Sequence, residues 1–221
     1  MKNANLNPLL EGLTVLDFTR VLAGPYCTRL LADLGARVIK VERPVEGDDT
    51  RAFYLQLEEG RTDQSSYFVR FNAGKESVAI DLARPGAKEV VLDLARKSNV
   101  LIENFVPGVM ARHGLDYAAV SAVNPAIVYC SISGYGQTGP LRDRPAFAHL
   151  INAAAGAMDL DRQGDPEPRV AYLQSADALA GVHAFGLVLA AVNRVQRTGQ
   201  GAYLDVSMLQ SLWGAEDIGI A

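Results

Sequence analysis

The beginning of the chain alternates between short apolar runs and a helical pattern. Residues 14–18 form an apolar run rich in β-branched residues, which Gly24 and Pro25 end. Apolar residues over 26–34 then recur at helical spacing, and Gly35 ends that helix. A second β-branched run at 38–41 follows within the span of one βαβ crossover, so we expect two parallel neighbouring strands. The chain therefore begins as an α/β fold.

The same alternation continues through the middle of the chain. We expect strands at 77–81, 100–103, 127–132 and 203–207. We expect helices from Pro85 and Gly86 to 97, at 107–112, at 117–123, over 145–158 and from 208 to 213. The strands at 77–81 and 100–103 form a second βαβ unit with the helix between them. These elements predict an open parallel sheet flanked by helices.

Three segments depart from this alternation. Residues 46–66 are polar and have no sustained period, which predicts an exposed excursion. Residues 159–169, with two prolines and four acids, are typical of a loop. The helix at 178–195 is apolar around most of its circumference, so we expect it to be buried on several sides, by another element or by a partner chain.

Composition narrows the function classes. A chain of 221 residues with 49% hydrophobic content can bury a sizeable core. The formal charge is only −4 and no basic block occurs, so we expect no nucleic-acid partner. The start of the chain lacks a signal or transit pattern and no later run is long enough for a bilayer, so we expect no membrane association and a cytoplasmic location.

Cysteines and histidines point away from metal and hydrolase chemistry. Cys27 and Cys130 are isolated on predicted buried elements, which fits two core residues in a reducing compartment. His113, His149 and His183 have no metal-ligand spacing and no Ser or Cys elbow accompanies them, so we expect no metal site. The first βα turn is not a GxGxxG fingerprint, which argues against a nicotinamide or flavin site.

Two further motifs occur later in the chain. GYGQTGP at 134–140 follows a predicted strand, and DALAGVHA at 177–184 opens the apolar helix. Together with residues 14–44, in this order, they resemble the class III CoA-transferase family (CaiB/BaiF, formyl-CoA transferase-like). The resemblance begins at about Leu10 and covers the rest of the chain.

The resemblance implies a Rossmann-like open parallel sheet, as in the large domain of this family. Family chains are roughly twice as long, so residues 1–221 are expected to be a large CoA-binding domain that ends before the small domain and its glycine-rich loop. Family members form interlocked dimers, which implies a homodimer or a complementing subunit. Coenzyme A or acyl-CoA is then a substrate, with a carboxylic acid as the second one, and no tightly bound cofactor is expected.

Asp177 lies at the predicted beginning of the apolar helix. On residue type alone, Ser175 or Asp177 would cap this helix by accepting a backbone N–H. The resemblance instead places Asp177 on the catalytic aspartate of the family. A carboxylate is ionised at neutral pH and can attack a thioester without a general base, provided that it is held close to the carbonyl carbon. The family reaction proceeds through an aspartyl anhydride and an aspartyl-CoA thioester.

The phosphates of CoA require cationic or N–H-donating groups. The resemblance implies nucleotide or diphosphate contacts from Arg43, Asn104, Phe105 and Arg112, and a further phosphate contact from Arg144 or Arg142. Two more positions, Ala23 and Ile80, match residues that line the adenine pocket. Each alone has an ordinary alternative, a solvated arginine or a core residue.

Gln137, in the glycine-rich loop, is a candidate catalytic residue that contacts substrate or the oxyanion. The alternative is that GYGQTGP is a plain turn.

Two other functions stay open at this stage. One is a non-catalytic acyl-CoA-binding fragment or subunit. The other is an α-methylacyl-CoA racemase, which pairs its aspartate with a histidine at the place where this chain has Phe147. Many transferases have an acid where this chain has Ala148. Oxalate, carnitine, succinate and aromatic acids all remain possible acceptors.

Overall fold

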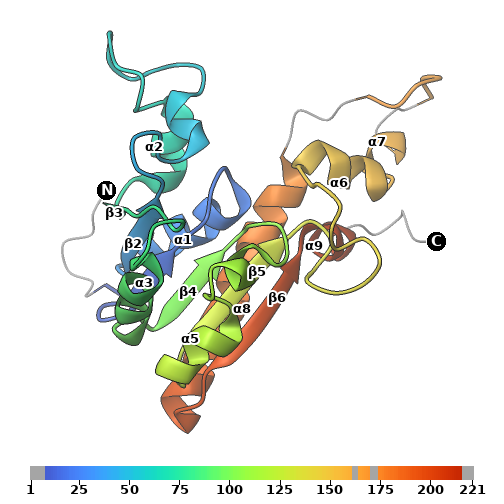
Figure 1. The fold of residues 1–221 in the computed structure, drawn as a ribbon. Helices are drawn as coiled ribbons and strands as arrows, with labels where there is room; N and C mark the ends of the chain where they lie inside the picture. The colour runs from blue at the N-terminus through green and yellow to red at the C-terminus, as the bar shows by residue number, and fades with distance from the viewer. Residues whose placement is uncertain (1–7, 161–163, 170–173, 216–221) are drawn as a thin grey trace.

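The computed structural model describes residues 8–160, 164–169 and 174–215. These residues form a six-stranded parallel sheet with helices on both faces (Figure 1). The strands are β1 (Thr14–Asp17), β2 (Arg37–Glu42), β3 (Glu76–Ala79), β4 (Val100–Glu103), β5 (Val128–Ser133) and β6 (Ala202–Ser207). The longer helices are α1 (Ala23–Asp33), α3 (Ala87–Arg96) and α8 (Ser175–Thr198). The shorter ones are η1 (Asp49–Ala52), α2 (Ser66–Asn72), α4 (Val109–Arg112), α5 (Tyr117–Val123), α6 (Ala148–Ala154), α7 (Ala157–Leu160) and α9 (Met208–Trp213).

The strand order is β3-β2-β1-β4-β5-β6, and every neighbouring pair is parallel. The predicted Rossmann-like sheet is thereby confirmed. The first βαβ unit pairs β1 with β2 as expected, but α3 connects β3 to β4 across the two strands that lie between them. The order reverses between β1 and β4, which is the switch point where open α/β sheets bind ligands.

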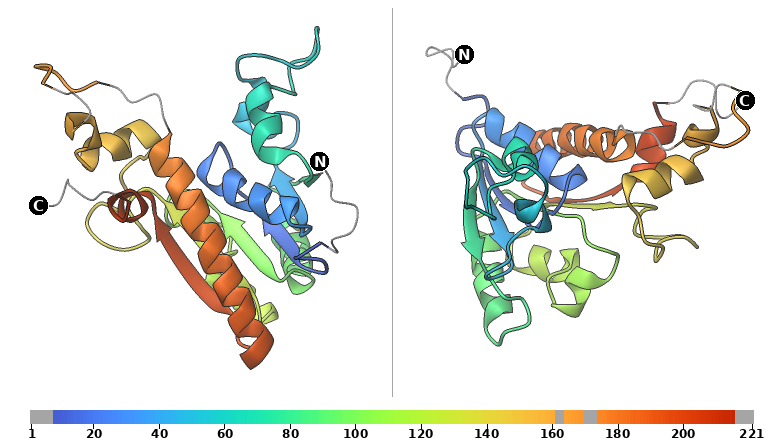
Figure 2. Two further views of the ribbon diagram at one scale, coloured as in Figure 1. Left: turned by 180° about the vertical axis from the view of Figure 1, so that it is seen from behind. Right: turned by 90° about the horizontal axis from the view of Figure 1, so that it is seen from above.

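Two apolar layers enclose the sheet. One contains α1, α6, α8 and α9 against β1, β4, β5 and β6, and the other contains α3, α4 and α5 against the opposite face (Figure 2). The central strands β4 and β5 are buried at every position because helices cover both faces. Cys27 and Cys130 both lie in the first layer, so their predicted core positions are confirmed.

Some predicted boundaries were wrong. The segment 46–66, expected to be exposed, contains η1 and buries Asp48, Thr50 and Ser65, although residues between η1 and α2 do extend away from the sheet (Figure 1). Helix α2 was not predicted; Ser65 caps it by accepting from the Phe68 N–H. The helix expected over 145–158 is interrupted at Gly156, whose φ of +82° ends α6 before α7 begins.

Helix α8 differs from its prediction in its burial. Small residues form the buried stripe, namely Ala176, Ala180, Gly181, Ala184, Val188 and Ala191. Val182 and Leu187, by contrast, are 47% and 45% exposed. Within the described part of the chain, α8 is therefore covered along one face and not on several sides. Small side chains occupy that face because the backbone of α8 lies close to that of α1.

The expectation that no run is long enough for a bilayer is also wrong for α8. This helix has 24 residues and a mean hydropathy of 1.6 in its most apolar window, of which 33% is buried. By length and composition alone it could cross a membrane. One such helix is weak evidence, since core helices meet the same criterion, and α8 packs against α1, α6, α9, β5 and β6.

The contact between α8 and α1 gives a testable prediction. A Cβ on Gly181 would lie 2.7 Å from the Ala23 carbonyl oxygen, whereas a Cβ on Gly186 would meet nothing within 4 Å. We expect Gly181→Ala to lower the free energy of unfolding by about 1–3 kcal/mol through overpacking. Gly186→Ala, the matched control, should raise it by up to about 1 kcal/mol through helix propensity. Urea unfolding measures both, and equal effects would contradict the close packing.

Candidate functional site

The turn after β1 lies at the switch point and is held by Asn104, the residue directly after β4. The Arg20 N–H donates to Asn104 Oδ1, and Asn104 Nδ2 donates to the Arg20 carbonyl oxygen, both at 2.8 Å. The Arg20 guanidinium lies 5.1 Å from the centre of the Phe105 ring. Val21 has a φ of +68°, a conformation that costs energy for a β-branched residue and that the surrounding contacts must maintain.

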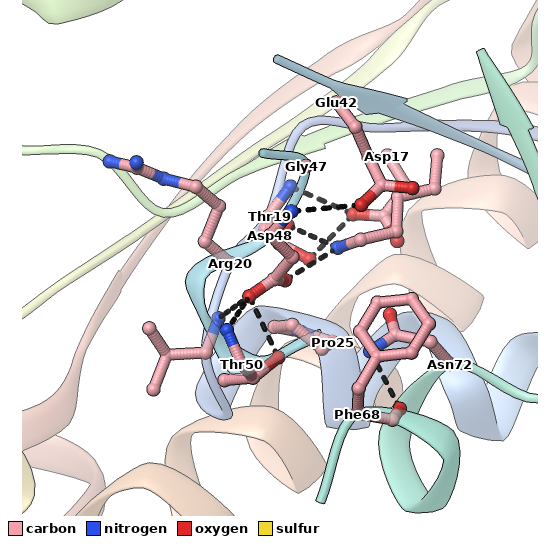
Figure 3. A network of polar contacts seen from close by, with 12 residues as sticks. Asp17, Thr19, Arg20, Pro25, Glu42, Gly47, Asp48, Thr50, Phe68 and Asn72 are labelled. Carbon is pink, nitrogen blue, oxygen red and sulfur yellow. Dashed lines mark hydrogen bonds and ion pairs between the residues drawn. The ribbon is translucent and has the colours of Figure 1, made fainter. Parts of the chain in front are cut away.

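Buried charges support this turn from behind. Lys40 Nζ donates to the Thr19 carbonyl oxygen at 2.6 Å and lies 3.0 Å from Asp48 Oδ2, and both ionic side chains are almost fully buried. Asp48 Oδ1 accepts from the Thr50 N–H and hydroxyl at 3.0 and 2.8 Å (Figure 3). Separating such a buried pair is costly because it leaves an uncompensated charge in the interior. The pair therefore fixes the loop before η1 against the turn after β1.

A second buried pair fixes the end of β1. Asp17 accepts from the hydroxyls of Thr19 and Thr28 at 2.5 and 2.7 Å, and Lys75 Nζ lies 3.1 Å from its Oδ2. Burial opposes the charged form, but Lys75 and Lys40 outweigh it and hold the pKa of Asp17 below its usual value. Burial lowers the pKa of Lys75 to about 8. Neither of these buried ion pairs was predicted from the sequence.

Two cavities meet at this turn. The larger, about 520 Å³, lies between the ends of β1, β2 and β4, and the smaller, about 250 Å³, reaches Asp177. Arg20, Phe105 and Val106 line both of them. An elongated ligand could thus extend from the larger cavity past Arg20 to the Asp177 carboxylate.

Asp177 lies in the first turn of α8 and faces the beginnings of two other helices. Burial raises its pKa to about 6, although the backbone N–H groups of Ala23 and Ala148, which donate to the carboxylate, and nearby His149 act in the opposite direction. Ala23 is the first residue of α1 and Ala148 is the first of α6, so the partial positive charge of both helix ends favours the anion.

The capping alternative for Asp177 finds no support in this geometry. The N-cap of α8 is Gln174, and it makes no side-chain capping hydrogen bond. The Ser175 hydroxyl donates to Asn152 Oδ1 at 3.3 Å instead of capping the helix. Asp177 accepts from α1 and α6 rather than from its own helix.

The predicted nucleotide-contacting residues divide between the two cavities. Arg43, Ile80 and Phe105 line the larger one. Ala23, Asn104, Phe105 and Arg144 line the smaller one with Asp177. The assignment of Ala23 and Ile80 to one adenine pocket stays a prediction. Arg142 also lines the smaller cavity, and Arg112 is exposed at the end of α4 and lines neither.

Gln137 lies apart from Asp177. It lines a third cavity of about 260 Å³ with Glu103 and Tyr203, and its backbone N–H donates to the Asp205 carboxylate. Its predicted contact with substrate stays a prediction that the geometry does not favour. Arg20 and Lys40, which the sequence analysis did not single out, line the larger cavity. Lys40 could have been noticed from the sequence, because it is a charged residue inside an apolar run.

No group of three or more His, Cys, Asp or Glu side chains that could hold a metal occurs among the residues that the structure describes.

Comparisons with known proteins show which family the chain resembles. The sequence profile of CoA-transferase family III matches residues 10–215. The acetyl-CoA:oxalate CoA-transferase of Acetobacter aceti is 44% identical over 199 residues, which is 90% of this chain and 50% of that protein. The succinate–glutarate CoA-transferase of Agrobacterium fabrum is 38% identical over 93% of this chain and 52% of that protein. The chain spans about half the length of these curated relatives.

A solved structure gives the same result. A CaiB/BaiF family protein from Brucella suis superposes with a TM-score of 0.88 at 38% identity, over 95% of this chain and 55% of that one.

The raised pKa of Asp177 predicts a pH-dependent effect on stability. Because the folded-state pKa of about 6 exceeds the unfolded value, the stabilisation from this group is complete below about pH 4 and is lost as the pH rises through 6. We expect Asp177→Asn to raise the free energy of unfolding at pH 8 by about 1–3 kcal/mol relative to the unsubstituted protein. The difference should be smaller at pH 4, and urea unfolding measures both.

The control is Asp93→Asn, which changes an exposed aspartate paired with Arg96 on α3. It should show no comparable dependence on pH. Lower stability of Asp177→Asn at pH 8 would contradict the burial of an unfavourable charge at this position.

Proposed function

Since the chain belongs to CoA-transferase family III, we propose that it moves CoA from an acyl-CoA thioester to a carboxylic acid with Asp177 as the nucleophile. The observation that carries the proposal is the position of the Asp177 carboxylate in the smaller cavity, with backbone N–H groups of Ala23 and Ala148 directed at it. The adjoining cavity offers space for the nucleotide end of CoA, with Arg43 and Ile80 in its wall.

The first half of the reaction releases the donor acid. The Asp177 carboxylate attacks the thioester carbon, which forms a mixed aspartyl anhydride and expels CoA thiolate. The thiolate then attacks the aspartyl carbonyl, so that CoA becomes a thioester of Asp177 and the donor acid leaves. A carboxylate is a weak nucleophile, and holding it close to the carbon compensates, with effective molarities that can reach about 10⁵ M or more.

The second half repeats these steps with the acceptor. The acceptor carboxylate attacks the aspartyl-CoA carbonyl, which forms a second anhydride and again releases CoA thiolate. Attack of the thiolate on the acceptor carbonyl gives the new acyl-CoA and restores the Asp177 carboxylate. With a pKa of about 6, Asp177 is largely ionised at neutral pH, so no general base is required for the first attack.

We further propose that the acceptor is a dicarboxylate. Arg142 and Arg144 line the cavity that contains Asp177, and a guanidinium binds a second carboxylate well. The relatives named above act on oxalate, succinate or glutarate by their names, in keeping with this charge.

Two alternatives make different use of the same cavity. A non-catalytic binding subunit would bind CoA and transfer nothing. An α-methylacyl-CoA racemase needs a base beside the aspartate, and Phe147 stands where the racemases have their histidine. His149 lies close enough to act on the charge of Asp177, but it does not line the cavity. The cytoplasmic location and the homodimer or complementing subunit stay predictions.

A transfer assay with isotopically labelled dicarboxylates tests the proposal. We expect Asp177→Asn to lower kcat about 10³-fold or more while CoA binding is retained, because the nucleophile is lost and the pocket is not. The rate of the unsubstituted protein should rise with pH through about 6, as the carboxylate ionises.

Asp93→Asn is the matched control, because it removes the same charge at an exposed position on α3 that lines none of the three cavities described above. It should change kcat by less than about threefold, which is the size expected of a side chain that makes no contact with the transition state. Full transfer by Asp177→Asn would refute the role of this residue. Exchange of an α-proton without transfer would favour the racemase.

A further inference from the structure

Asp49 lies between two arginines where the two cavities meet. Its Oδ2 is 3.6 Å from Arg20 Nη1, and its Oδ1 forms a hydrogen-bonded ion pair with Arg43 Nη2. Arg20 lines both cavities, Arg43 lines the larger one and Asp49 lines the smaller one. One carboxylate thus bridges two guanidiniums at the point through which an elongated ligand would pass.

The backbones of these three residues are fixed independently of the bridge. The Arg20 backbone is held by the paired hydrogen bonds to Asn104, and its side chain extends away from the buried network (Figure 3). Asp49 begins η1 directly after Asp48, which is fixed by Thr50 and Lys40. Arg43 directly follows β2. Both guanidiniums therefore extend from fixed backbone positions toward the place that the Asp49 carboxylate occupies.

The two ion pairs of this bridge are weak because all three side chains are exposed to water. The side chains of Arg20, Asp49 and Arg43 are 37%, 50% and 49% exposed, and ion pairs at such positions contribute little because water screens them. A diphosphate carries more charge than one carboxylate and more acceptor oxygens for the planar guanidinium groups. A diphosphate ester would therefore displace Asp49 from the arginines.

We propose that Asp49 is an internal counter-ion that occupies the diphosphate position between Arg20 and Arg43 and is displaced when CoA binds. Arg20 then contacts the diphosphate of CoA at the entrance to the Asp177 cavity. Naming CoA as the ligand rests on the proposed function. Because Asp49 competes with the ligand, it weakens CoA binding and favours release of the acyl-CoA product.

Calorimetric titration with CoA and with pantetheine, which has no phosphate, tests this inference. We expect Asp49→Asn to bind CoA about threefold to tenfold more tightly, since an exposed ion pair contributes up to roughly that factor, and to bind pantetheine unchanged. Arg20→Gln should weaken CoA binding, and adding Asp49→Asn to it should produce a smaller gain than in the parent protein. Thermal unfolding checks that each variant is folded.

Asp93→Asn removes the same charge at a residue that lines neither cavity and that pairs only with Arg96 on α3 among the contacts that the structure describes. It should leave the dissociation constant for CoA unchanged. Unchanged or weaker CoA binding by Asp49→Asn would overturn the inference and leave the proposed function intact. Absence of CoA binding in every form would overturn both, whereas CoA binding without transfer would contradict the proposed function alone.

Discussion

The site depends on a partly buried carboxylate held where three helices begin. Asp177 lies in the first turn of α8, and the first residues of α1 and α6 donate their N–H groups to it. This requires α8 to lie close to α1, which Gly181 permits because any side chain there would meet the Ala23 carbonyl oxygen. Burial raises the pKa of Asp177 to about 6, so the protein gives up stability at neutral pH to retain an ionised group away from bulk water.

The sheet topology explains why the larger cavity adjoins the one that reaches this carboxylate. The strand order reverses between β1 and β4, and the larger cavity lies where the segments that follow β1, β2, β3 and β4 meet. Lys40 and Asp48 fix one side of that space with a buried ion pair, and Asn104 fixes the other through the backbone of Arg20. Rigid walls of this kind let a weak nucleophile rely on position.

The local pattern of apolar and polar residues predicted most helices and strands, but it did not predict which residues pair across long distances in the sequence. The strand at 100–103 and the helix at 117–123 have the predicted boundaries because their apolar residues face a continuous core. Residues 46–66 were predicted to be exposed because the segment is polar and has no sustained period, and nothing local shows that Asp48 pairs with the buried Lys40. The role of Asp177 as a nucleophile could be proposed only from the resemblance to the family motif. The hydrogen bond from Gln137 to a carboxylate 68 residues later places that glutamine in another cavity, which residue type does not reveal.

The central claim is that Asp177 carries CoA covalently during transfer. Intact-protein mass measured after incubation with a panel of acyl-CoA esters tests it most directly. We expect a CoA-sized or acyl-sized adduct that hydroxylamine removes and that Asp177→Asn abolishes. No adduct on a protein shown separately to bind CoA, or an adduct that persists in Asp177→Asn, would contradict it.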